Sequence, residues 1–259
     1  MAFRDNGVPG PAIVLIHGNS ASSAAWLPMY EEPVARQRRL VALDMPGCGA
    51  SGRLASYSVT GLGAAIRNVA AAIGCEDGVF VGHSLGGHLL IEAMPKLPRA
   101  RGFVVAGAPP LRKPPNTDEA FLESPALGFG LTGELTDQDI NDWIAALFAP
   151  QNPVPDGLFA DMRRADPRVR SGIQAGLASL EYTDEAEVVR MLRQPIAVLH
   201  GRLDAMVSRT YVESLPMPTL WRGRVQVIEG AGHYAHVERP AEFAALLGEF
   251  ADDVFTAGR

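Results

Sequence analysis

The sequence predicts an α/β fold, in which a mostly parallel, doubly wound sheet carries helices on both faces. Short apolar runs alternate with alanine- and leucine-rich segments along most of the 259 residues, and this alternation is typical of parallel strands joined by helical crossovers. Glycine and proline bound most of the apolar runs, as in strands buried on both faces. Hydrophobic residues make up 47% of the chain, which is enough for a sizeable core.

Six apolar runs are predicted to be strands of this sheet, and residues 2–5 are expected to add a short edge strand. The six runs are Ala12–Ile16, Leu40–Leu43, Val79–Val81, Gly102–Ala106, Ile196–Leu199 and Val225–Ile228. Four helices are predicted between or after these strands. They span Val59–Ile73, Leu85–Met94, Thr210–Leu215 and Pro240–Phe255.

One long region interrupts the alternation. Residues 111–193 contain short helical pieces separated by proline and glycine, and no convincing strand. An insertion between two sheet strands commonly covers the edge of the sheet where a ligand binds. We therefore expect a helical lid over 111–193, inserted in an α/β core formed by 1–110 and 194–259, with the whole chain making one structural unit.

The clearest helix of this lid is predicted over 136–149. Thr136 and Asp139 resemble an N-terminal capping box, with Asp in place of the usual Glu or Gln. Four apolar side chains repeat at helical spacing and should form its buried face. They are Ile140, Ile144, Leu147 and Phe148.

The charge balance argues against a nucleic-acid partner. Lysine and arginine number 23 against 29 acidic residues, for a formal net charge of −6, and the chain has no basic stripe. The densest basic run, 163–170, is interrupted by Asp166 and is predicted to be a solvated helix face. No stretch approaches the ~18 apolar residues that a membrane span requires, and the first ten residues lack the apolar centre of a secretory signal.

The two cysteines, Cys48 and Cys75, form no C-x-x-C pair and have no histidines at metal-binding spacing. Two reduced thiols in a cytoplasmic protein are the simplest interpretation. The sequence predicts no metal, flavin or nucleotide cofactor, and it is compatible with a monomer or a homodimer.

A serine between two glycines, Gly82 and Gly86, lies where a predicted strand passes into a predicted helix. In this context G-x-S-x-G forms a tight turn that lifts the Ser84 hydroxyl above the sheet. The first N–H groups of the helix point to the same place, and the helix dipole favours negative charge there. Ser84 is therefore a candidate nucleophile, although a serine in a glycine-rich turn can also be purely structural.

Two further candidates follow in the chain order Ser, acid, His. Asp204 comes after the strand 196–199, and His233 lies in a loop between the strand 225–228 and the last helix. Polar residues that follow consecutive parallel strands meet at the ligand-binding edge of a sheet. We expect His233 to take the Ser84 proton, while Asp204 fixes the tautomer of the imidazole and stabilises the imidazolium.

The strand 12–16 runs into His17, Gly18 and Asn19, where glycine lets the backbone approach a ligand. The backbone N–H groups of Asn19 and Leu85 are predicted to converge on the oxyanion of an acyl-transfer reaction. One such donor typically contributes ~3–4 kcal/mol to transition-state stabilisation. The sequence thus supplies every part of an acyl-transfer site.

Several other signals have a structural interpretation. GCGASG at 47–52 matches a dinucleotide-binding pattern, but Pro46 precedes it, no helical pattern follows, and no strand-end acid appears about 20 residues on. This loop is expected to shape the wall of the site instead. The other histidines that could compete with His233 are expected to be structural or pocket-lining. They are His88, His200 and His236, and His83 beside the nucleophile either lines the pocket or packs.

Five segments of the chain form an ordered set. They are HG at 17–18, DMPGCGAS at 44–51, GHSLGG at 82–87, RLD at 202–204 and GAGHYAHVERP at 230–240. Together they resemble the α/β-hydrolase superfamily over nearly the whole chain, and the resemblance implies a serine hydrolase that works through an acyl-enzyme. Most haloalkane dehalogenases and epoxide hydrolases of the superfamily place aspartate where this chain has Ser84.

This chain departs from the superfamily pattern in two places. Only eleven residues precede Ala12, so we expect the first strand of the usual eight-stranded sheet to be missing. Cys48 occupies a position where the family often has histidine or an aromatic residue, and no catalytic role is affected.

Four more segments narrow the resemblance. They are HGNSASS at 17–23, AGAPPLRK at 106–113, DQDINDW at 137–143 and LPMPTLWRGRVQVIEGAGH at 215–233. They look like the α/β-hydrolase N-acyl-homoserine lactonases, which are quorum-quenching enzymes in which a lid tyrosine lies near the lactone, about where Trp143 falls. The resemblance implies that this chain cleaves, without a cofactor, the lactone ring of an N-acyl-homoserine lactone or a similar lipophilic ester. Tryptophan keeps a donor in its indole N–H but differs from tyrosine in reach.

The lid is rich in apolar side chains, and those that face Ser84 would form a pocket for a medium acyl chain. A general carboxylesterase, or a hydrolase of C–C bonds in ring-cleavage products, would use the same triad. A non-catalytic ligand receptor on this fold is a further alternative, against which the complete triad argues. The residues assigned to substrate binding are Gly18, His83, Phe121, Trp143, Phe148 and Tyr234.

Overall fold

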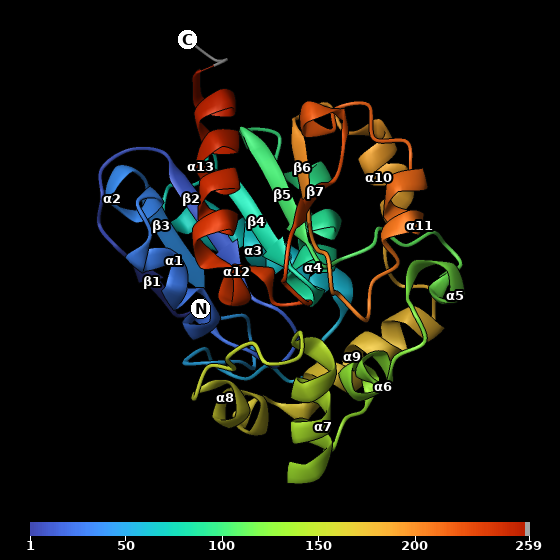
Figure 1. Ribbon diagram of the computed structural model, residues 1–259. Coiled ribbons are helices and arrows are strands. Elements are labelled where there is room, and N and C mark those ends of the chain that lie inside the picture. Colours follow the sequence, from blue (N-terminus) through green and yellow to red (C-terminus); the bar gives the residue numbers. More distant parts are fainter. Residues whose placement is uncertain (257–259) are drawn as a thin grey trace.

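The computed structural model describes residues 1–256, and its centre is a seven-stranded sheet with helices on both faces (Figure 1). The strand order is β1-β3-β2-β4-β5-β6-β7, and all neighbouring strands are parallel except β1 and β3. This arrangement confirms the doubly wound α/β fold, and every predicted strand is present, with ends that shift by at most two residues. The strands are β1 (Phe3–Asp5), β2 (Ala12–Ile16), β3 (Arg39–Leu43), β4 (Val79–His83), β5 (Gly102–Ala106), β6 (Ile196–Gly201) and β7 (Gln226–Ile228).

The central strands are buried on both faces of the sheet. In β2, Val14 and Ile16 contribute to one core and Ile13 and Leu15 to the other, and none of these four residues has exposed surface. This two-sided burial is the reason that parallel strands are continuous apolar runs in the sequence.

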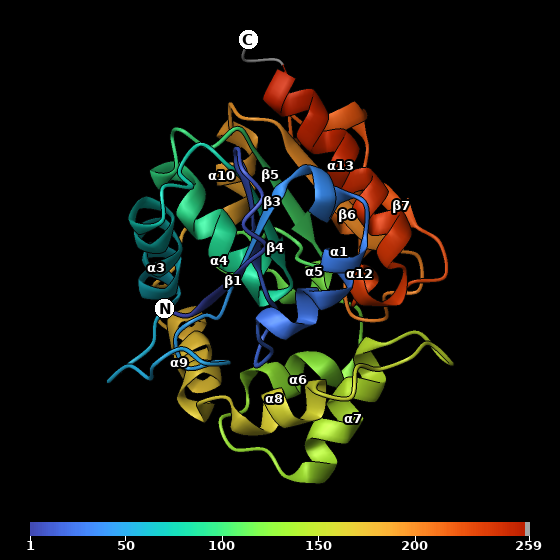
Figure 2. The same ribbon diagram turned by 90° about the vertical axis from the view of Figure 1, so that its left-hand side faces the viewer.

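Helices cover the two faces of the sheet in two separate groups, and the members that Figure 2 labels lie on opposite sides of the sheet. One group is α3 (Val59–Ala72), α4 (Leu85–Ala93) and α11 (Arg209–Ser214), and the other is α1 (Leu27–Glu31), α2 (Val34–Gln37), α12 (Ala235–Glu238) and α13 (Pro240–Thr256). The four predicted helices are confirmed to within one residue at each end. Short 3-10 turns span Ser23–Trp26, Met94–Lys96 and Trp221–Gly223. None of the helices in residues 1–256 is long and apolar enough to cross a membrane.

The strand order reverses direction at β2. The chain passes from β2 to β3 through α1 and α2, and after α3 it returns so that β4 pairs with the opposite side of β2. In open parallel sheets such a reversal leaves a crevice beyond the carboxyl ends of two adjacent strands, and ligands bind there. Residues that directly follow β2 and β4, including Asn19 and Ser84, are therefore positioned at this crevice.

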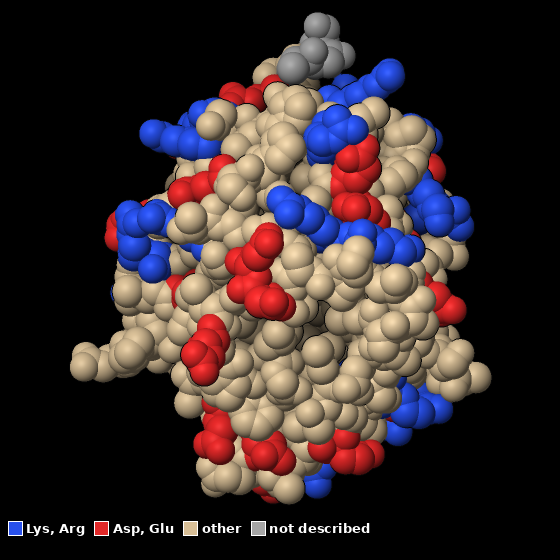
Figure 3. Space-filling view, turned by 90° about the vertical axis from the view of Figure 1, so that its right-hand side faces the viewer, with Lys and Arg blue, Asp and Glu red and all other residues tan. Residues whose placement is uncertain are grey.

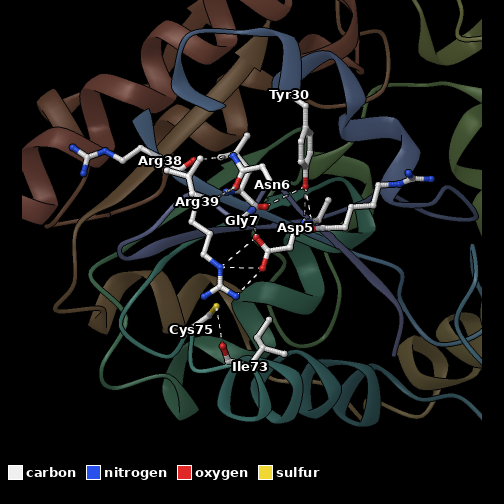
Figure 4. Close-up of polar contacts among 12 residues, drawn as sticks. Asp5, Asn6, Gly7, Tyr30, Arg38, Arg39, Ile73 and Cys75 are labelled. Atoms are coloured by element: carbon white, nitrogen blue, oxygen red, sulfur yellow. Dashed lines mark hydrogen bonds and ion pairs between the residues drawn. The ribbon is translucent and has the colours of Figure 1, made fainter. Parts of the chain in front are cut away.

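β1 forms the antiparallel edge of the sheet, and polar side chains hold it there (Figure 4). Asp5 pairs with Arg39 of β3, with 2.7 Å between a carboxylate oxygen and a guanidinium nitrogen, and this contact lowers the pKa of Asp5. The Asn6 side chain donates to the carbonyl oxygens of Ala35 and Arg38. The expected edge strand is thus confirmed. Within the described residues the sheet has seven strands and not the eight that are usual in the superfamily.

Between β5 and β6 the chain forms the predicted helical insertion, and α6 to α9 lie together beyond one edge of the sheet (Figures 1 and 2). Residues 111–193 contain no strand, and only an isolated bridge joins Phe121 to Val207. The helices are α5 (Thr117–Ala120), α6 (Pro125–Leu131), α7 (Asp137–Leu147), α8 (Leu158–Arg164), α9 (Pro167–Ala178) and α10 (Glu185–Met191).

The helix predicted over 136–149 is α7, and its capping box is confirmed. The Thr136 hydroxyl accepts from the Asp139 N–H at 3.1 Å, and the Asp139 carboxylate accepts from the Thr136 N–H at 2.8 Å. These two reciprocal bonds satisfy backbone donors that would otherwise be unpaired at the start of the helix. The four apolar side chains predicted to share a face are all buried.

The basic run 163–170 is not simply a solvated helix face, and that prediction is wrong for two of its residues. Asp166 and Arg170 are only 1% and 3% exposed. Asp166 accepts from the Tyr57 hydroxyl at 2.9 Å and pairs with Arg168, which holds its pKa at about 2. Arg170 donates to the carbonyl oxygen of Thr132 at 2.7 Å. A charged group can be buried when hydrogen bonds replace its hydration, and here the bonds join the insertion to itself and to the core.

Candidate active site

Ser84 lies at the sharp turn between β4 and α4. Its φ is 51°, a positive value that is uncommon outside glycine and needs support from the surrounding structure. Its N–H donates to the carbonyl oxygen of Ala106 at 2.8 Å. Gly82 and Gly86 give the turn its room, because a Cβ at Gly82 would lie 2.5 Å from the Gly86 carbonyl oxygen and one at Gly86 would collide with the His17 carbonyl oxygen. The flanking glycines are therefore a steric requirement of this turn.

Asp204 and His233 come together beyond the ends of β6 and β7. The His233 Nδ1 atom lies 2.9 Å from a carboxylate oxygen of Asp204, and both side chains are almost fully buried. The other Asp204 oxygen accepts from the backbone N–H groups of Met206 at 2.8 Å and Val207 at 3.1 Å. Burial by itself would raise the pKa of Asp204, but the attraction and hydrogen bond of His233 outweigh burial, and the pKa is lowered. Asp204 is thus a fixed anion beside the imidazole.

The opposite nitrogen of His233 is available for proton transfer. Its Nε2 atom is buried and has no hydrogen-bond partner within residues 1–256, and His233 and Ser84 line the same cavity. The His233 imidazole packs against Gly107, which has a φ of +60°. A Cβ at this position would lie 2.9 Å from the His233 Cε1 atom, so the glycine leaves space for the ring. An imidazole held by a carboxylate at Nδ1 and free at Nε2 is the arrangement that a general base requires.

The two amides predicted to form an oxyanion hole are unused. Within residues 1–256, neither the Asn19 N–H nor the Leu85 N–H donates to another group, and both residues line the cavity beside Ser84. Leu85 is the first residue of α4, where backbone N–H groups have no partner inside the helix. Gly18 lies close behind the nucleophile, because a Cβ there would be 3.3 Å from the Cβ of Ser84.

The helical insertion holds the loop that carries Asn19. The Asn19 side-chain nitrogen donates to the carbonyl oxygen of Gly130 at 2.8 Å, and its side-chain oxygen accepts from the Ser20 hydroxyl at 3.0 Å. Ser20 in turn accepts from the Arg170 guanidinium at 2.7 Å. The insertion thus positions one of the two candidate oxyanion donors, a connection that no sequence pattern indicated.

The cavity beside Ser84 is mostly apolar. Its volume is about 100 Å³, measured as the space open to the centre of a water-sized sphere. On the face of the molecule that carries α5, α10 and α11, the surface is hollowed, and mostly uncharged atoms border the hollow (Figure 3). Apolar walls come from α3, α6, α7 and α9. They include Val59, Leu127, Leu131, Leu147, Ile173 and Leu177.

Three of the residues assigned to substrate binding line this cavity, namely Phe121, Trp143 and Tyr234. The other three do not. Phe148 stacks on Tyr234 with 4.9 Å between ring centroids, so it supports the wall from behind. Gly18 and His83 lie behind Ser84, where the His83 Nε2 atom is 2.9 Å from the His233 carbonyl oxygen. The loop 47–52 does not line the cavity either, contrary to the sequence analysis, and its Gly47 carbonyl accepts from the Asp166 N–H.

The remaining histidines have distinct surroundings. His236 is completely buried, stacks on Trp26 with 4.0 Å between centroids, and burial lowers its pKa to about 3. Burial also lowers the pKa of His200. His88 lines the cavity and pairs with Glu185 of α10. The position of His88 agrees with the structural or pocket-lining role expected for it. Glu185 was not predicted, because in the sequence it is an ordinary acid at a helix start.

Among residues 1–256, no three His, Cys, Asp or Glu side chains are arranged to hold a metal ion. The polar groups around Ser84 are a hydroxyl, an imidazole, a carboxylate and two backbone amides. This set can perform acyl transfer by nucleophilic attack, general base catalysis and oxyanion stabilisation. That the chemistry needs no cofactor stays a prediction.

The chain belongs to the α/β hydrolase family, whose family model matches residues 13–246. Its structure is similar to crystal structures of the N-acyl homoserine lactonase AidH. One of these, a mutant complexed with N-hexanoyl homoserine lactone, is 30% identical with a TM-score of 0.92, and the match covers 97% of this chain and 93% of that one.

Two curated relatives match a similar share of the chain at slightly lower identity. The pimeloyl-(acyl-carrier protein) methyl ester esterase of Edwardsiella ictaluri is 28% identical over 93% of both chains. The 2-hydroxymuconate semialdehyde hydrolase of Pseudomonas sp. is also 28% identical, over 96% of this chain and 89% of that one. The comparisons confirm the predicted fold and the resemblance to the N-acyl-homoserine lactonases, while the relatives include hydrolases of different bonds.

Proposed function

We propose that the protein is a serine hydrolase that opens the lactone ring of N-acyl-homoserine lactones through an acyl-enzyme. The observation that carries the proposal is the Asp204–His233 pair, whose free Nε2 shares an apolar cavity with Ser84 at the turn after β4. The similarity to AidH supports the choice of a lactone. The esterase among the relatives supports the more general chemistry of ester cleavage.

In the first half of the reaction, the Ser84 oxygen attacks the lactone carbonyl carbon while its proton passes to the Nε2 atom of His233. The negative charge that develops on the carbonyl oxygen is stabilised by the N–H groups of Asn19 and Leu85. The ring C–O bond then breaks, and His233 gives its proton to the departing ring oxygen. Asp204 stabilises the imidazolium throughout these steps.

In the second half, His233 takes a proton from water, and the resulting hydroxide adds to the carbonyl carbon of the acyl-enzyme. The bond to the Ser84 oxygen then breaks, and the proton on His233 returns to that oxygen, so that the open-chain N-acyl-homoserine leaves. The freed alcohol stays tethered to the acyl-enzyme, so water has to compete with ring closure. A cavity with room for the alcohol to turn away from Ser84 favours hydrolysis.

We further propose that residues 111–193 act as a lid over this site, and that Trp143 contributes its indole N–H to lactone recognition. Trp143 lines the cavity from α7, and Gly130 of the insertion is bonded to Asn19. The two cysteines are buried free thiols, which fits the cytoplasmic location inferred from the sequence.

The proposal is tested with a substrate panel. Ring opening of N-acyl-homoserine lactones with acyl chains of four to twelve carbons is followed by mass spectrometry, beside hydrolysis of p-nitrophenyl butyrate and of a ring-cleavage dienoate. Lactone binding is measured in parallel by calorimetry. We expect kcat/KM for at least one lactone to equal or exceed the value for the aryl ester. Trp143→Phe, which keeps an aromatic ring but loses the N–H, is expected to raise KM for lactones more than KM for the aryl ester.

Each outcome of the panel has a distinct meaning. Activity on the aryl ester alone would overturn the lactonase assignment and leave a general carboxylesterase. Activity only on a ring-cleavage dienoate would indicate a C–C bond hydrolase of the same fold. Tight lactone binding without any turnover would indicate a ligand receptor.

A further inference from the structure

The cavity contains a second pair of imidazole and carboxylate that the proposed reaction does not use. The Nδ1 atom of His88 lies 2.8 Å from one Glu185 carboxylate oxygen and 3.0 Å from the other. This geometry repeats that of His233 and Asp204, whose separation is 2.9 Å. His88 and Glu185 line the same cavity as Ser84.

Both oxygens of the Glu185 carboxylate have hydrogen-bond partners within the protein. Its side chain is 4% exposed, and one of its oxygens also accepts from the Leu111 N–H at 2.8 Å. The carboxylate therefore joins α10 of the insertion to α4 of the core and to the segment after β5. This bracing explains the Nδ1 contact of His88, but it leaves the other ring nitrogen unexplained.

The Nε2 atom of His88 has no hydrogen-bond partner within residues 1–256, and the His88 side chain keeps 16% of its surface exposed. Because Nδ1–H donates to Glu185, the neutral ring presents an acceptor lone pair at Nε2. The cavity that His88 lines is mostly apolar, and the Phe121 ring centroid lies 6.4 Å from that of His88. A polar atom in an apolar wall is unfavourable unless a ligand or water bonds to it, and such atoms are typically the ones that orient a ligand.

The position of His88 relative to the nucleophile limits which part of a substrate it can reach. His88 lies in the first turn of α4, and its N–H donates to the carbonyl oxygen of Ser84, the N-cap residue, at 3.2 Å. The candidate hydrogen-bonding group is therefore close to the scissile carbonyl and not at the end of a long acyl chain.

We propose that His88, held by Glu185, is a specificity-determining residue. It binds a hydrogen-bond donor in the part of the substrate that carries the scissile carbonyl and becomes attached to Ser84. The donor is an amide N–H or a hydroxyl within a few bonds of the scissile carbonyl. The inference rests on the proposed function, since it takes Ser84 as the nucleophile. It predicts that the enzyme prefers acyl groups with such a donor over unsubstituted acyl groups of the same length.

Three methyl esters of equal chain length test this inference at pH 8, namely hexanoate, 3-hydroxyhexanoate and 3-methoxyhexanoate. The methoxy ester keeps the oxygen but lacks the donated hydrogen. We expect kcat/KM for the hydroxy ester to exceed that for hexanoate about tenfold, as one good hydrogen bond allows, and the methoxy ester to gain nothing. In His88→Leu the ratio of hydroxy ester to hexanoate is expected to fall to about 1.

Two further variants separate the donor site from general changes in the cavity. Glu185→Gln keeps an acceptor for the Leu111 N–H but loses the charge that fixes the His88 tautomer, and the ratio is expected to fall to about 3. Leu177→Ala enlarges the cavity without touching the pair, and its ratio is expected to stay near ten. The wild-type comparison of hydroxy and methoxy esters remains decisive if His88→Leu does not fold.

A second arm depends on Ser84 alone and not on the substrate class. Fluorophosphonates with a hexyl or a 3-hydroxyhexyl chain are compared by their rates of labelling Ser84 in wild type and His88→Leu. Absence of ester and lactone turnover would overturn the proposed function, while the labelling ratio still tests the donor site. A ratio near 1 in wild type, or an equal ratio in wild type and His88→Leu, would overturn the inference.

Discussion

Replacing Asp204 by asparagine changes one atom and tests the geometry of the base. The backbone N–H groups of Met206 and Val207 need an acceptor, so the amide oxygen of the new side chain stays on them. The amide nitrogen then faces the Nδ1 atom of His233 across 2.9 Å. A donor at this place forces Nδ1 to be the acceptor, and the ring proton moves to Nε2, where it blocks uptake of the Ser84 proton.

The expected loss follows from this change of tautomer. Asparagine in this position also fails to stabilise the imidazolium, and kcat/KM is expected to fall about 10⁴-fold at pH 7. A loss of that size corresponds to ~5 kcal/mol of transition-state stabilisation. Because the side chain keeps its volume and its two backbone contacts, the melting temperature is expected to change little. The KM is expected to change less than kcat.

The assay is hydrolysis of p-nitrophenyl butyrate, with thermal unfolding followed by circular dichroism. Asp44→Asn is the control for loss of a buried carboxylate. Asp44 accepts from the Ser23 N–H with one oxygen and from the Ala50 N–H with the other, so this variant loses one of the two contacts. The control is expected to keep its activity within about threefold. If Asp204→Asn retained a tenth or more of wild-type kcat/KM, Asp204 would not be the acid of the site and the reasoning would be refuted.

Three other predictions concern the surroundings of the site. Ser20→Gly suits the φ of 57° at this position and removes the hydrogen bond to the Asn19 side chain. We expect kcat to fall about fivefold with an unchanged KM. A change confined to KM would contradict the role of Ser20 in positioning Asn19. Gly107→Ala puts a Cβ 2.9 Å from the His233 ring. We expect kcat to fall about 10²-fold, as for a misplacement of ~1 Å, and the free energy of unfolding to fall by ~1–2 kcal/mol. A wild-type kcat would show that the imidazole ring tolerates the added methyl group and contradict this prediction. The pKa of His236 is about 3 in the fold and about 6.5 unfolded, so the unfolded chain binds the proton first and stability falls as pH drops from 6.5 towards 3. The free energy of unfolding is measured with urea at pH 7 and pH 4.5. Between these two pH values, His236→Phe is expected to lose ~2–3 kcal/mol less of this free energy than wild type. Equal losses would contradict the low pKa assigned to His236.

The sequence predicted the sheet and its helices well because burial on both faces leaves a direct trace. Strands such as β2 and β5 are uninterrupted apolar runs, and their ends are marked by glycine or proline. The order of Ser84, Asp204 and His233, each after a strand, led to the candidate site for the same reason, since parallel strands present their carboxyl ends at one edge.

What the sequence did not reveal depends on contacts between distant segments. Arg170 and Asp166 look like surface charges until their partners are known, and Ser20 and Tyr57 lie 150 and 109 residues away from them. Helical periodicity predicted that Phe148 shares the apolar face of α7. It does not indicate that Tyr234 stacks on Phe148 and separates it from the cavity. Glu185 could not be recognised as part of the cavity, because nothing near it in sequence indicates His88.

We propose that the Ser84 oxygen is the attacking atom and that His233 is its base. The most direct measurement is covalent labelling with a fluorophosphonate, followed by mass spectrometry of the proteolytic peptides. We predict one adduct per chain, located on Ser84, formed rapidly by wild type and at least 10³-fold more slowly by His233→Ala. An adduct on another residue, or equal labelling rates in wild type and His233→Ala, would contradict it.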